Sequence, residues 1–116
     1  MTEKLAAKVE AFRALHRRPG AFIIPNPWDA GSARILAGLG FEALATSSGA
    51  AANTFGRRDG GITRSQSLAN ARAIVEATDL PVAADLENGF GHGAADVVVT
   101  IREASAAGLV GGSIED

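Results

Sequence analysis

Four short apolar segments, separated by helical patterns, constrain the fold of this chain more than any other feature. The segments cover residues 21–24, 41–46, 80–84 and 109–114. Residues 2–16, 29–39, 63–78 and 97–107 carry the helical patterns. Runs of four to six apolar residues favour buried strands, and strands that alternate with helices form a parallel sheet through right-handed crossovers. We therefore expect one α/β unit over residues 1–116, with four parallel strands and an additional N-terminal helix.

Local signals support these boundaries. Asp29 is a good N-cap for a helix that Gly40 ends, and Thr63 with Gln66 matches a capping box. The β-branched run 97–101 favours a strand by composition, but its apolar residues share one helical face, so we predict a helix there. Residues 47–62 are dotted with glycine and predict a loop.

Composition excludes several classes of protein. The 116 residues include 11 Lys and Arg and 13 Asp and Glu, so the chain lacks the excess of positive charge that binding to nucleic acid requires. The absence of cysteine excludes disulfides, thiolate metal sites and a cysteine nucleophile in this chain. No apolar run approaches the roughly 20 residues of a membrane span, and the charged N-terminal helix is unlike a secretory signal. We expect a cytoplasmic protein that contacts neither nucleic acid nor membrane.

Polar residues follow each predicted strand. Because parallel strands point their carboxyl ends the same way, we expect these residues to meet at one rim, where ligands bind in such folds. They are Asn26, Trp28 and Asp29 after the first strand, Thr46 to Gly49 after the second, Asp85, Glu87 and Asn88 after the third, and Glu115 and Asp116 after the fourth.

The acidic residues of this rim predict a metal site. Asp85 and Glu87 project to the same side at strand spacing, and Glu115 comes from the neighbouring strand. Two carboxylates about 4 Å apart repel each other by roughly 4 kcal/mol at an effective dielectric constant near 20. A divalent cation bound between them removes this repulsion. All-oxygen ligands select magnesium or manganese. The alternative is that these acids cap helices or lie in solvent.

Two other motifs have alternative interpretations. Ser47 to Gly49 could present backbone N–H groups to an oxygen anion, or form an ordinary turn. Residues 89–94, Gly-Phe-Gly-His-Gly-Ala, could be a dinucleotide-binding fingerprint. Against it, residues 85–88 separate the strand from the first glycine, and the acids among them would face a pyrophosphate with the wrong charge.

Four segments resemble the isocitrate lyase/phosphoenolpyruvate mutase superfamily, in order from about residue 20 to the end. They are Pro25 to Ala33, Ala45 to Ala50, Leu80 to Gly91 and Ser113 to Asp116. The resemblance implies a (β/α)8 TIM barrel that binds Mg²⁺ (or Mn²⁺) and cleaves or forms C–C or P–C bonds beside the carboxylate of a small α-keto or α-hydroxy acid. It implies a lyase or phosphonomutase acting through an enolate-like intermediate.

The resemblance also implies roles for particular residues. Asp85 is the expected metal ligand, with Glu87 and Glu115 holding metal-bound waters and Asp59 as a further acid of the metal site. Ser48, Gly49 and Ala50 are the expected turn that holds the substrate carboxylate or its oxyanion. Departures from the family pattern are Arg58 where proline is common, Glu87 where aspartate is more frequent, and Val110-Gly111-Gly112 before the last strand.

A full barrel takes about 250 residues, so the resemblance makes this chain the N-terminal half of one. Open sheet edges then predict self-association, and we expect a homo-oligomer. A non-catalytic half-barrel that binds metal or carboxylate within an assembly is the alternative to an enzyme.

Overall fold

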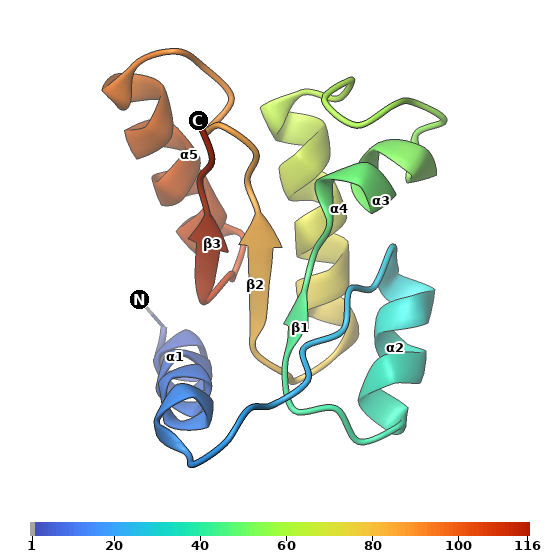
Figure 1. Ribbon diagram of the computed structural model, residues 1–116, viewed down its shortest axis with the longest axis vertical. Helices are drawn as coiled ribbons and strands as arrows, with labels where there is room; N and C mark the ends of the chain where they lie inside the picture. The colour runs from blue at the N-terminus through green and yellow to red at the C-terminus, as the bar shows by residue number, and fades with distance from the viewer. Residues whose placement is uncertain (1) are drawn as a thin grey trace.

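The computed structural model describes residues 2–116 and contains a three-stranded parallel sheet (Figure 1). The strands are β1 (Leu44–Ala45), β2 (Val82–Asp85) and β3 (Gly111–Ser113), in the spatial order β1-β2-β3. Leu44 lies opposite Val82, and Asp85 lies opposite Ser113. Consecutive strands are therefore parallel neighbours, as the alternation of strands and helices predicts.

Five helices accompany the sheet in the described part of the chain: α1 (Glu3–Arg17), α2 (Ala30–Gly38), α3 (Ser48–Thr54), α4 (Arg64–Ala77) and α5 (Ala94–Ala106). The predicted caps are confirmed, because Asp29 accepts from Ser32 N–H and Thr63 forms a capping box with Gln66. The β-branched run 97–101 lies inside α5, as predicted. Between residues 2 and 116 no helix has both the length and the apolar character needed to cross a membrane.

Two predictions from the sequence are wrong. Residues 21–24 form no strand; beyond them, Pro25 O accepts from Ala45 N at 3.1 Å and Asn26 Nδ2 donates to Ala45 O at 2.9 Å. Pro25 and Pro27 lack the N–H groups that a ladder needs, so residues 25–27 lie beside β1 without extending the sheet. The predicted loop 47–62 contains α3, which Ser47 caps by accepting from Ala50 N.

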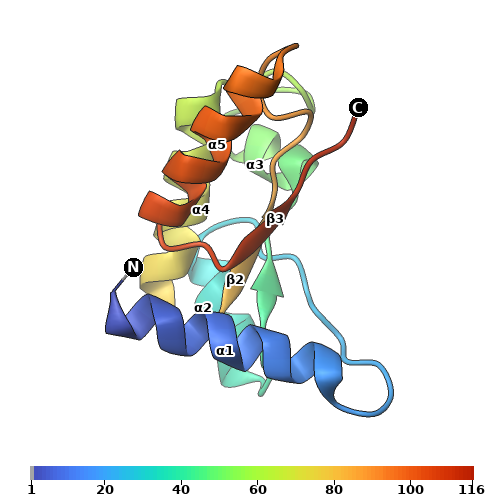
Figure 2. The same ribbon diagram turned by 90° about the vertical axis from the view of Figure 1, so that its left-hand side faces the viewer.

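The core lies between the sheet and the helices on one of its faces (Figure 2). Val82, Ala84 and Leu86 are buried there against Leu68 and Ile74 of α4, among other residues. Ala83 and Asp85, which alternate with them, are only partly buried. The strand pleat thus turns Asp85 away from the core, toward the other face.

Gly112 has a packing role where β3 pairs with β2. A Cβ at this position would lie 2.6 Å from Leu86 Cδ1 and 3.2 Å from Ala84 O. Leu86 is fully buried, so its side chain has little room to move. The glycine lets β3 approach β2 closely, at the end of the strands where the polar residues collect.

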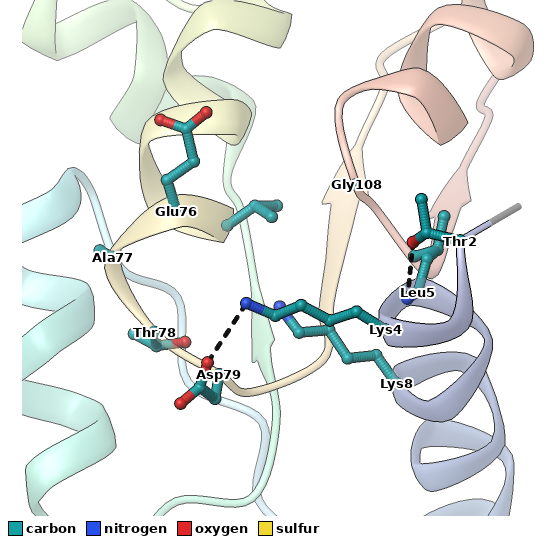
Figure 3. A pocket seen from close by; sticks show the side chains of 10 residues that line it. Thr2, Lys4, Leu5, Lys8, Glu76, Ala77, Thr78, Asp79 and Gly108 are labelled. Carbon is teal, nitrogen blue, oxygen red and sulfur yellow. Dashed lines mark hydrogen bonds and ion pairs between the residues drawn. The ribbon is translucent and has the colours of Figure 1, made fainter.

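Helix α1 crosses the end of the sheet opposite the carboxyl ends of the strands (Figure 2). Lys4 and Lys8 extend from α1 toward the C-terminal end of α4, where Lys4 Nζ lies 3.5 Å from Asp79 Oδ1 (Figure 3). Burial, followed by the ammonium of Lys4, lowers the pKa of Lys8. Lys4 and Lys8 line a cavity of about 280 Å³ between α1 and the end of α4.

A buried hydroxyl connects three elements below the loop that follows β2. Thr100 of α5, which is fully buried, donates to Gly89 O at 2.6 Å and accepts from Arg64 Nε of α4 at 2.8 Å. Arg64 also reaches the carbonyl oxygens of Phe90 and Asp96, at 3.5 and 3.4 Å. These bonds hold the loop between β2 and α5 against both helices.

Replacing this hydroxyl tests its contribution. We expect Thr100→Val, which keeps the shape, to lower the free energy of unfolding by about 1–3 kcal/mol, because Gly89 O and Arg64 Nε lose their buried partner. Thr100→Ser, which keeps the hydroxyl, is expected to cost less. Urea unfolding monitored by circular dichroism measures both variants. A Thr100→Val protein as stable as the wild type would show that the hydroxyl contributes nothing.

Candidate functional site

A cavity of about 670 Å³ opens at the carboxyl ends of the strands, where the sequence predicts the site. It draws residues from the ends of β2 and β3, from the start of α3 and from the loops before α4 and α5. Its lining is strongly acidic. The lining residues are Ser48, Asp59, Gly60, Ile62, Asp85, Glu87, Asn88, Phe90, Gly91, His92, Glu115 and Asp116.

Asp85 is the most firmly held of these acids. It ends β2, and its Oδ2 accepts from Ser48 N and its Oδ1 from Glu87 N, both at 3.1 Å. Burial raises the pKa of Asp85, but hydrogen bonds from the Ser48 side chain and from the N–H groups of Glu87 and Ser48 outweigh it and hold the pKa below its ordinary value. Asp85 is thus a fixed carboxylate that stays ionised at neutral pH.

The pKa of Glu87 is shifted in the opposite direction from that of Asp85. Burial, then the negative charges of Asp59 and Asp85, raise its pKa above the ordinary value. Its Oε2 is buried with no hydrogen-bond partner among the described residues. Its backbone has φ of 54°, in the left-handed region that a residue with a side chain rarely adopts. An unpaired buried oxygen on a strained backbone is typical of a functional position.

Asp59 reaches the same cavity from the loop between α3 and α4. A Cβ at Gly49 would lie 3.8 Å from Asp59 Oδ2, so this carboxyl stands beside the first turn of α3. The sequence alone gives only its place in a loop, 26 positions before Asp85. Its role as a further acid of the metal site stays a prediction.

Glu115 follows β3, where the hydrogen bonding between the β2 and β3 segments continues beyond the strands. Its N–H donates to Glu87 O at 2.6 Å, two residues beyond the pairing of Leu86 N with Ser113 O. The backbone therefore places Glu115 next to Glu87, as the parallel sheet predicts. The residue itself is exposed at the mouth of the cavity, with Asp116 beside it in the sequence.

The predicted carboxylate-binding turn is the first turn of α3. Ser48 N donates to Asp85, and Ala50 N donates to Ser47 Oγ at 3.3 Å. Of the three N–H groups at residues 48–50, only that of Gly49 is left without an acceptor among residues 2–116. An anion at this turn would therefore find one free N–H and the Ser48 hydroxyl, fewer backbone donors than the sequence predicts.

The acids share a cavity but do not form a tight cluster. In the described part of the chain, no three His, Asp or Glu side chains lie close enough to hold a metal ion by themselves. Asp85, Glu87, Glu115 and Asp59 line one cavity, with Glu115 exposed at its mouth, and their joint binding of a metal ion stays a prediction.

The donor set nevertheless fits a hard divalent cation. All the acidic candidates offer oxygen, and Glu87 Oε2 is an orphaned buried acceptor of the kind that a cation or its water would satisfy. Magnesium keeps several of its waters and takes one or two carboxylates directly, so it does not require three converging protein ligands.

The glycine loop before α5 does not match a dinucleotide fingerprint. Leu86, Glu87 and Asn88 separate β2 from Gly89, and α5 begins only at Ala94. The loop also lines the acidic cavity. A pyrophosphate placed there would face Asp85 and Glu87, which would repel it.

His92 lines the cavity although no role can be assigned to it from the sequence. A single histidine in a glycine-rich loop is usually a surface residue, and only the path of the loop between β2 and α5 shows what it faces. Phe90 is also part of the lining, with φ of 59°.

Comparison with known proteins gives the chain a family context. A family model described as phosphoenolpyruvate phosphomutase matches residues 12–116. The 2,3-dimethylmalate lyase of Eubacterium barkeri is 40% identical over 96 residues, which are 81% of this chain and 33% of that protein. The 2-methylisocitrate lyase of Bacillus subtilis (strain 168) is 34% identical over 115 residues, 98% of this chain and 37% of that protein.

Among solved structures, one from Burkholderia cenocepacia J2315, classed as a lyase or mutase, matches with a TM-score of 0.96 and 59% identity. The match covers 98% of this chain and 41% of that one. The chain thus spans between a third and two fifths of the length of these relatives. These matches confirm the predicted resemblance and, with the parallel sheet, the fold class of a partial (β/α)8 barrel.

The raised pKa of Glu87 predicts how stability depends on pH. A carboxyl whose folded pKa lies above its unfolded value, ordinarily about 4.3, destabilises the fold as pH rises from that value through the folded pKa. We therefore expect Glu87→Gln to be more stable than the wild type at pH 7, with the difference disappearing below about pH 4. Urea midpoints across this range measure the difference.

Glu103→Gln, which alters an exposed acid of α5, is the matched control and should change nothing at either pH. A Glu87→Gln protein that is less stable than the wild type at pH 7 would contradict the assigned like-charge repulsion.

Proposed function

Because the chain belongs to the phosphoenolpyruvate phosphomutase family, we propose that it carries the metal- and carboxylate-binding part of a lyase or phosphonomutase. The reaction makes or breaks a C–C or P–C bond next to the carboxylate of a small α-keto or α-hydroxy acid. The observation that carries the proposal is Asp85, fixed by two N–H groups at the end of β2 and facing a cavity lined by acids. The names of the relatives, lyases of dimethylmalate and methylisocitrate, support the reaction class.

Asp85 and Glu87 are the residues that would hold Mg²⁺, or Mn²⁺ in its place, with Asp59 and Glu115 binding its waters. The ionised state of Asp85 and the unpaired Oε2 of Glu87 support this assignment. When bound, the cation supplies Lewis-acid stabilisation of negative charge on substrate oxygen.

The chain's own residues have separate tasks in this proposal. Gly49 orients the substrate carboxylate through its free N–H at the start of α3, beside the Ser48 hydroxyl that hydrogen-bonds Asp85, with Ala50 completing the turn. Asp85 holds that turn in place, because the Ser48 N–H donates to its Oδ2. Donors fixed in this way need no rearrangement when charge develops on a substrate oxygen.

The domain assignment is part of the same proposal. Residues 1–116 would be the N-terminal half of such a barrel, with β3 as the open edge of the sheet, since Pro25 and Asn26 already pair with Ala45 on the outer side of β1. Unpaired strand edges favour pairing with further strands, which supports an oligomer or a larger assembly. A half-barrel that binds metal and carboxylate without turnover is the alternative, and the substrate assay below separates the two.

Binding of the cation tests the first part of the proposal. We expect MgCl₂ to raise the Tm of the wild type and to have no effect on Asp85→Asn, because the substitution removes the charge but keeps the shape. A ligand present at 100 times its Kd stabilises the folded state by about 2.7 kcal/mol, which a thermal melt detects readily. Glu103→Gln should respond like the wild type. An unchanged response in Asp85→Asn would refute Asp85 as the ligand.

Turnover tests the second part. With Mg²⁺ present, the wild type should consume at least one of 2-methylisocitrate, oxaloacetate and phosphonopyruvate, and Asp85→Asn should lose this activity by at least a hundredfold, as loss of a single transition-state stabiliser commonly does. Magnesium binding without turnover of any substrate would favour the non-catalytic alternative.

A further inference from the structure

His92 is unusual among the residues of the acidic cavity because of its charge. Five of the described lining residues carry carboxylates, namely Asp59, Asp85, Glu87, Glu115 and Asp116. His92 is the one residue of that lining that can carry a positive charge. It also lines a neighbouring cavity of about 480 Å³, which shares with the first Asn88, Gly91, Glu115 and Asp116. His92 thus stands where the two cavities meet.

The loop that carries His92 is held firmly on both sides of it. Gly91 packs so closely on α5 that a Cβ there would overlap the carboxyl group of Asp96. On the other side, Gly93 N donates to Asp96 Oδ2 at 3.3 Å. Before these residues, Phe90 N donates to Asn88 Oδ1 at 3.0 Å. The backbone around His92 is therefore placed by contacts, while its own side chain is exposed.

The substrates of the proposed function are anions, and the acidic residues of the cavity repel them. A small dicarboxylate or phosphono-carboxylate brings two anionic groups into a cavity that already holds several negative charges. A cation beside Asp85 and Glu87 offsets this repulsion for the group that it touches. The second anionic group needs another partner, and a ring N–H of His92 can donate a hydrogen bond to it.

We propose that His92 binds the second anionic group of the substrate, at the junction of the two cavities. This inference rests on the proposed function and deepens it, because it names the residue that receives the second anionic group. It assigns His92 a direct contact with substrate, and leaves the metal and the first carboxylate to Asp85, Glu87 and the start of α3.

Binding of two small probes tests the proposal. Succinate carries two carboxylates separated by two methylene groups, and succinamate replaces one of them with a neutral amide. In the presence of Mg²⁺, we expect His92→Ala to weaken succinate binding by about tenfold or more, and to weaken succinamate binding by much less. His92→Arg, which places a cationic donor at the same position, should recover most of the succinate affinity. Isothermal titration calorimetry measures each Kd.

A pair of glycine substitutions tests the placement of the loop. Gly91→Ala should displace His92 and weaken succinate binding in the same way as His92→Ala, because its Cβ overlaps Asp96. Gly93→Ala is the matched control, since a Cβ there would meet only Asp96 Oδ2, at 3.8 Å. It should bind succinate like the wild type.

The outcomes separate the two proposals. If His92→Ala binds succinate as tightly as the wild type, or loses both probes equally, or if the wild type binds succinate no better than succinamate, the role of His92 is refuted while the proposed function stands. If MgCl₂ fails to stabilise the wild type, the proposed function fails, and the role of His92 fails with it.

Discussion

The carboxylate of Asp85 connects the three segments on which the candidate site depends. Its oxygens accept hydrogen bonds from the N–H groups of Ser48 and Glu87, and so join the end of β2 to the start of α3 and to the loop that leads to α5. The alternate residues of β2 are buried in the core, so the sheet fixes the position of Asp85. The other acids line the same cavity around this carboxylate.

Repulsion among the carboxylates of the cavity explains the remaining features of the site. Glu87 lies beside Asp85 and Asp59 with a buried, unpaired oxygen and a left-handed backbone, an arrangement that is unfavourable for the isolated chain. Such an arrangement makes physical sense where a cation occupies part of the cavity. The tight contacts of Thr100 and Gly91 hold the adjoining loop in place despite this repulsion.

Sequence patterns predicted the elements whose signals are local. The capping box of Thr63, a strand leading to Asp85 and the common rim of acids follow from short motifs and from the direction of parallel strands. The strand expected at 21–24 is absent, because the chain meets β1 only beyond this apolar run, at Pro25 and Asn26. Helix α3 was not predicted, because its Ser-Gly-Ala sequence has no apolar period. The spacing of the acids and the position of His92 depend on how the loops pack, which residue types alone do not specify.

The proposed function depends on one divalent cation held beside Asp85 by the carboxylates at the ends of the strands. Anomalous diffraction from crystals soaked in MnCl₂ can test this binding, because manganese can be located without reference to the protein density. We expect a single strong peak in the acidic cavity, within coordination distance of an oxygen of Asp85 or Glu87. A peak confined to exposed acids elsewhere, or a cavity without a peak at saturating Mn²⁺, would contradict it.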